Sequence, residues 1–92
     1  MTWTQEQSIN FECAREVIND LMAIYSNEIY VEEHKVEPNN DKIDRLEAEL
    51  IRLKREKSAL SVNDDAAVAE VRSKYSPLVR TWRDEHNKTQ AA

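Results

Sequence analysis

The chain has 92 residues, a net charge of −5 and no glycine. Without glycine it contains no Gly-rich phosphate-binding loop, no dinucleotide-binding fingerprint and no nucleophile elbow, because each of these needs backbone conformations that glycine supplies. Tight β-hairpins favour glycine as well, so the composition predicts an all-α fold. The length of the chain allows one small domain or a few long helices.

The first predicted helix covers about residues 4–33. Thr2 and Thr4 are its N-cap candidates, and each has a glutamine three residues on, which is a weak form of the capping box. The apolar residues recur at helical spacing and define one buried stripe. This stripe consists of Phe11, Ala14, Ile18, Leu21, Met22, Tyr25 and Ile29, and is widened by Val17, Ile24 and Val31.

The end of this helix and the first break are less sharply marked. Glu32 and Glu33 would sit badly at the negative end of the helix dipole, so we expect the helix to end between Tyr30 and Lys35. The break is expected over residues 36–40, where Pro38 pushes the preceding residue out of helical geometry. The two asparagines that follow it tolerate left-handed backbone and can also cap the next helix.

The second predicted helix, about residues 41–60, has the clearest pattern. Acidic residues crowd its start and basic residues its end, which complements the helix dipole. Its apolar residues follow an alternating spacing of three and four, interrupted only by Lys57. They are Ile43, Leu46, Leu50, Leu53 and Leu60.

A second break is expected over residues 61–64, where Ser61 and Asn63 are the N-cap candidates. The third predicted helix covers about residues 65–86 and keeps the same spacing through Val68, Val71, Tyr75, Leu78 and Trp82. Pro77 interrupts this helix, so that it either kinks there or restarts with Ser76 as its N-cap. The preserved spacing favours a kinked or closely continued helix, and residues 87–92 are expected to be a frayed tail.

These elements predict a single domain of two or three long antiparallel helices, forming a helical hairpin or a small bundle with a short coiled-coil seam. Only 20 residues are Ile, Leu, Val or Phe, so we expect a homodimer to complete the core. The predicted helix–helix and self-association seam consists of Phe11, Ile18, Leu21, Tyr25, Ile43, Leu46, Leu50, Leu53, Leu60, Val71, Tyr75 and Trp82.

The residues that usually carry catalysis or bind metals form no recognisable pattern. His34 and His86 lie far apart and lack the short ligand spacing of a zinc site or the Glu-x-x-His motif of a di-iron bundle. Cys13 has no identifiable catalytic partner and lies beside the apolar stripe, where it would act as a small hydrophobe. We therefore expect no enzyme activity, no catalytic residue, no cofactor and no metal.

The cysteine content and the N-terminal sequence also bear on the cellular compartment. A single cysteine and the absence of a secretory signal indicate a reducing compartment, and we expect a cytoplasmic protein. No run of 18 apolar residues exists in the sequence, so we expect no membrane partner.

Charge is unevenly distributed along the chain. Residues 1–40 hold eight acidic and two basic residues, whereas residues 50–83 hold eight basic and four acidic ones. This split predicts either that the two halves pack against each other or that they form two docking surfaces.

The favoured function is a small non-enzymatic protein-interaction module, such as an adaptor, an assembly factor or a small regulator, whose partner is another protein. One alternative is a nucleic-acid-associated regulator that uses a basic face within residues 52–83, formed by Arg52, Arg55, Lys57, Arg72 and Arg80. The other is an acidic DNA mimic that uses residues 1–40.

Overall fold

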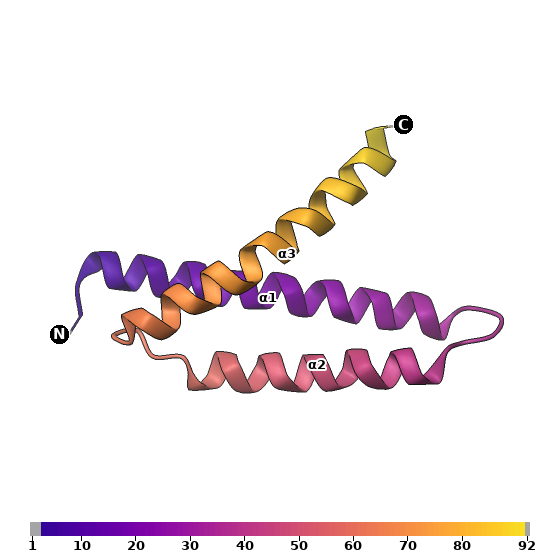
Figure 1. Ribbon diagram of the computed structural model, residues 1–92, viewed down its shortest axis with the longest axis horizontal. Coiled ribbons are helices and arrows are strands. Elements are labelled where there is room, and N and C mark those ends of the chain that lie inside the picture. The colour runs from indigo at the N-terminus through magenta and orange to yellow at the C-terminus, as the bar shows by residue number, and fades with distance from the viewer. Residues whose placement is uncertain (1–2, 92) are drawn as a thin grey trace. The chain divides into compact units, whose positions relative to one another are not determined.

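The computed structural model describes residues 3–91, with side chains described up to Asn87, and in this part of the chain it contains three α-helices and no strand. These helices are α1 (Gln5–Glu33), α2 (Asn40–Ala59) and α3 (Asp65–Ala91) (Figure 1). The predicted all-α fold is confirmed. None of the three helices is both long and apolar enough to cross a membrane within the described residues.

The first two helices begin at N-caps that the sequence predicts. Thr4 and Gln7 form a complete capping box, in which the backbone N–H of each residue donates to the other's side chain, at 2.8 and 3.1 Å. Thr2, the other candidate, lies outside the described residues. At α2, the backbone N–H of Lys42 donates to Oδ1 of Asn39 (3.1 Å). No described residue has a positive φ, so this turn is built without left-handed backbone.

The N-cap of α3 differs from the prediction. Oδ1 of Asp64 accepts the backbone N–H of Ala67 (3.1 Å), so Asp64 is the cap rather than Ser61 or Asn63. The side chains of those two residues bond to each other instead, with Ser61 donating to Asn63 (2.7 Å). The cap therefore lies one residue closer to the helix than the nearer candidate.

The helix ends also refine the predicted boundaries. Although α1 carries two glutamates in its last turn, it continues through Tyr30 to Glu33. Pro77 lies inside α3, so the alternative of a new helix that starts at Ser76 is wrong. Nor does α3 end at His86, because no proline or glycine follows Pro77 and the helix continues to Ala91.

The chain forms two compact units, and α1 contributes to both. The α1–α3 unit comprises Met1–Leu21 and Leu60–Ala92, and the α1–α2 unit comprises Met22–Ala59. In the α1–α3 unit, contacts advance along both helices in the same direction. Gln7 donates to Asp65, Arg72 to Asn10 and Arg83 to Asp20, each at 3.0 Å, so these segments run in parallel.

Beyond Pro77, the face of α3 that is buried in the core of the α1–α3 unit differs from the predicted face. The buried residues of α3 are Val68, Val71, Tyr75 and Val79, whereas Leu78 is 48% exposed. Steps of four residues separate the last three, as they separate Ala14 from Ile18 on α1, and such ridges are typical of helices that cross obliquely. Beyond Pro77 the buried residue is therefore Val79, four residues after Tyr75, and not Leu78, three residues after it.

The α1–α2 unit is a helical hairpin in which α2 runs back along the second half of α1 (Figure 1). Its buried apolar residues are Ile24 and Ile29 on α1 and Leu46 and Leu53 on α2. Leu53 is fully buried. The pattern of leucines therefore identifies the inward face of α2 correctly.

The twelve residues of the predicted seam differ in burial. Six of them are buried, namely Ile18, Leu21, Leu46, Leu53, Val71 and Tyr75. The others are only half-buried, namely Phe11, Tyr25, Ile43, Leu50, Leu60 and Trp82. The seam residues thus contribute to the cores of both units.

Candidate functional site

Among the described residues, Glu32 is the one buried acidic side chain, with 3% of its surface exposed. Its Oε2 atom accepts the backbone N–H of Asn39 (3.1 Å). Its Oε1 atom accepts Nζ of Lys35 (3.0 Å) and lies 3.4 Å from Nζ of Lys42. One carboxylate therefore joins the last turn of α1, the connecting turn and the first turn of α2.

This arrangement corrects the expectation that Glu32 is unfavourable at a helix C-terminus. The backbone N–H of Asn39 is the main cause that lowers the pKa of Glu32, and Lys35 and Lys42 add to it, while burial acts in the opposite direction. The pairing of Glu32 with Lys35 at a spacing of three can be read from the sequence. The bond to Asn39 cannot, because it depends on how the turn folds back.

Replacement of Glu32 by glutamine is expected to destabilise the hairpin near neutral pH. Because the pKa of Glu32 is lowered in the folded state, its contribution is fully present above the ordinary glutamate pKa of about 4.3 and is lost as the pH falls through the folded value. The melting temperatures of wild type and Glu32→Gln, measured by circular dichroism from neutral to acidic pH, should therefore converge in acid. Glu33→Gln is the matched control at an exposed neighbour. An equal effect of both variants at every pH would contradict the role of Glu32.

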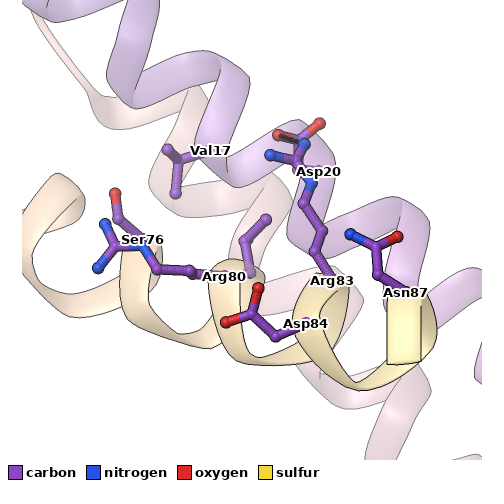
Figure 2. A pocket seen from close by; sticks show the side chains of 8 residues that line it. Val17, Asp20, Ser76, Arg80, Arg83, Asp84 and Asn87 are labelled. Atoms are coloured by element: carbon purple, nitrogen blue, oxygen red, sulfur yellow. Dashed lines mark hydrogen bonds and ion pairs between the residues drawn. The ribbon is translucent and has the colours of Figure 1, made fainter. Parts of the chain in front are cut away.

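A groove of about 300 Å³ lies between the two helices of the α1–α3 unit (Figure 2). Val17 and Asp20 line it from α1, and α3 contributes Ser76, Val79, Arg80, Arg83, Asp84 and Asn87. Arg83 reaches across to Asp20 and forms an ion pair at 3.0 Å. With two arginines and two aspartates the groove has no net charge, and its arrangement suits a polar contact better than binding of a single strongly charged ligand.

Several large apolar side chains remain on the surface of the helices. Ile9 is 55% exposed on α1, Ile51 is 52% exposed on α2 and Leu78 is 48% exposed on α3. Near the turn of the α1–α2 unit, Tyr30, Val31 and Val36 are also exposed. Ile51 lies outside the leucine spacing of α2, which is the signal that marks its outward position in the sequence.

The five residues of the predicted nucleic-acid face belong to both units. Arg52, Arg55 and Lys57 lie on α2, whereas Arg72 and Arg80 lie on α3 in the α1–α3 unit. The charge of Arg52 is already compensated, because its guanidinium contacts Glu49 and also forms an ion pair with Glu56 (3.1 Å). Arg72 donates to Asn10 and Arg80 lines the groove.

Internal ion pairs use part of the acidic N-terminal segment. Glu12 pairs with Arg15 (3.3 Å), and Asp20 pairs with a basic residue of α3. Glu32 pairs with one lysine of the turn and one of α2. The other five acids of residues 1–40 are Glu6, Glu16, Glu28, Glu33 and Glu37. Part of the uneven charge distribution is therefore neutralised within each unit.

Both histidines have the same local arrangement. Nδ1 of His34 lies 2.7 Å from the carbonyl of Tyr30, and Nδ1 of His86 lies 2.8 Å from the carbonyl of Trp82. Each imidazole also packs against the aromatic ring four residues earlier, with centroids 4.0 and 3.6 Å apart. These contacts hold each ring against its own helix, and sequence analysis missed the aromatic partners although their i,i+4 spacing is visible.

The remaining site candidates add no chemistry. Cys13 is a free, half-buried cysteine. In the described residues, no three His, Cys, Asp or Glu side chains come together as a metal site would require. Comparison of the chain with protein-family models, with curated proteins and with solved structures finds no match. The candidate sites that remain are the groove of the α1–α3 unit and the exposed apolar and charged surfaces of the helices.

Proposed function

We propose that this chain is a small, non-enzymatic protein-interaction module of the cytoplasm that acts through helix–helix contacts and is completed by homodimerisation. Its partners are other proteins, as for an adaptor, an assembly factor or a small regulator. The observation that carries this proposal is the set of large apolar side chains exposed on all three helices, namely Ile9, Tyr30, Ile51 and Leu78.

These side chains fit helix docking because they lie outside the buried stripes. An apolar residue on an otherwise charged helix anchors a partner helix when neighbouring charges set its orientation. The contacts of the arginines also favour a protein partner over nucleic acid. Arg52 is held by two glutamates and Arg72 by Asn10, so neither is available for phosphate without losing these contacts.

Each exposed anchor can be tested by one substitution to glutamate. We expect the tagged wild-type chain to retain a stoichiometric protein partner, and Ile9→Glu, Tyr30→Glu, Ile51→Glu or Leu78→Glu to lose it. Helicity should be unchanged, because each side chain is about half exposed or more. The measurement is affinity capture after cross-linking, followed by titration of the purified partner in a calorimeter.

Loss of the partner in one variant and its retention in the others would assign the docking helix. The proposal would be refuted if the wild-type chain forms no stoichiometric complex, neither with another protein nor with itself. If the material captured by the chain still binds to all four variants and is released only in high salt, the nucleic-acid alternative is favoured instead.

A further inference from the structure

The outward face of α2 carries a regular set of exposed residues. Ile51 is 52% exposed near the middle of the helix, and Ala48 is exposed one turn before it. Alternating steps of three and four residues extend this face in both directions, as in a coiled-coil seam. Its members are Asp41, Asp44, Ala48, Ile51, Arg55 and Ser58, all of them exposed.

This face is complementary to itself when the helix is reversed. The midpoint of α2 (Asn40–Ala59) lies between Glu49 and Leu50. Reversal about this point places Ala48 opposite Ile51 and Asp44 opposite Arg55. A two-fold axis through the midpoint would therefore set a small side chain against a large one, and an acid against a base, at both ends of the contact.

Charge favours the antiparallel orientation over the parallel one. The acids outnumber the bases in the first half of α2, whereas the second half contains Arg52, Lys54, Arg55 and Lys57 with one acid. Parallel pairing would bring like charges together, but antiparallel pairing brings the acidic half of one helix to the basic half of the other. Glu47 and Lys54 flank the face and would form a second pair between copies.

Asp44 and Arg55 carry the charge complementarity of this face. Asp44 and Arg55 take part in no ion pair in the part of the chain that the structure describes. Eleven residues of helix separate them by roughly 16 Å, which is too far for a direct contact. Arg52, which flanks the face and would approach Arg45 of a second copy, is compensated by Glu49 and Glu56.

We propose that a second copy of this chain packs antiparallel against the outward face of α2, with Asp44 of each copy paired with Arg55 of the other and with Ala48 packed against Ile51. This inference rests on the proposed interaction function and names its surface and register. The apolar part of the face is small, so the dimer is weak, with a dissociation constant of roughly micromolar or above, and is weakened by salt.

A charge exchange tests the register directly. Dimerisation of the full chain is measured by sedimentation equilibrium at low salt. We expect Asp44→Arg and Arg55→Asp each to raise the dissociation constant about tenfold or more, because two-fold symmetry makes each substitution act twice. The double variant Asp44→Arg/Arg55→Asp should restore dimerisation, since it recreates both pairs with reversed polarity.

Matched controls separate this contact from effects of net charge or hydrophobicity. Glu16→Arg changes the net charge as Asp44→Arg does, at an exposed site on α1, and should leave dimerisation unchanged. Ile51→Glu should weaken it, whereas Val36→Glu, at a fully exposed valine of the turn, should not. Circular dichroism checks that every variant keeps its helicity.

Three results would overturn the inference. They are a monomeric wild type at high concentration, an equal loss in Asp44→Arg and Glu16→Arg, or a double variant that fails to recover while its helicity is intact. A monomeric wild type that still binds another protein would remove the homodimer from the proposed function but leave the protein-interaction role standing, so that the failure of one is distinguishable from the failure of the other.

Discussion

Truncation of Leu53 to alanine is expected to lower the free energy of unfolding by about 2–5 kcal/mol. Leu53 is one of the largest fully buried side chains of the described structure. Its removal loses the transfer free energy of the buried methyl groups and leaves a cavity that the neighbouring helix closes only in part. Against a total stability of about 5–15 kcal/mol for a typical small domain, this is a large fraction.

The matched control for this variant is Leu78→Ala. The chemical change and the gain in helix propensity are the same, but Leu78 is 48% exposed. Urea unfolding followed by circular dichroism should therefore show a large shift of the midpoint for Leu53→Ala and a small one for Leu78→Ala. Equal shifts would mean that the inward faces of α2 and α3 are assigned incorrectly.

Replacement of Tyr75 by alanine is expected to have a similarly large effect, about 3–5 kcal/mol, because an aromatic side chain leaves the core. Tyr75 is 1% exposed and lies on α3 between Val71 and Val79, which are also buried. Its loss removes the largest of the fully buried side chains in the described structure. Thermal unfolding should show a lower midpoint and a loss of cooperativity in the α1–α3 unit.

Tyr30→Ala provides the comparison for this second variant. Tyr30 is 60% exposed and contacts the ring of His34, so its truncation loses little more than that local contact. We expect its midpoint to remain close to that of the wild type. If Tyr75→Ala proves as mild as Tyr30→Ala, then α3 does not pack through the face that contains Val71, Tyr75 and Val79.

Local interactions explain why much of the fold follows from the sequence. The capping box of Thr4 and Gln7 and the cap at Asn39 depend only on residues within one turn of the chain. The leucine spacing of α2 identifies its buried face because this face packs along the second half of α1. For Asp64, the choice among neighbouring polar residues depends on turn geometry that the sequence does not reveal.

The sequence by itself determined the three helices, their caps at two of three starts, and most of the buried stripes, because these depend on short-range hydrogen bonds and helical periodicity. The tertiary structure decided what depends on contacts between segments. Oblique packing of α3 buried Val79 and left Leu78 exposed, and the folded turn brought Asn39 to Glu32. It also left Ile51 on the outside of the hairpin, because the face of α2 that carries Leu53 packs inward.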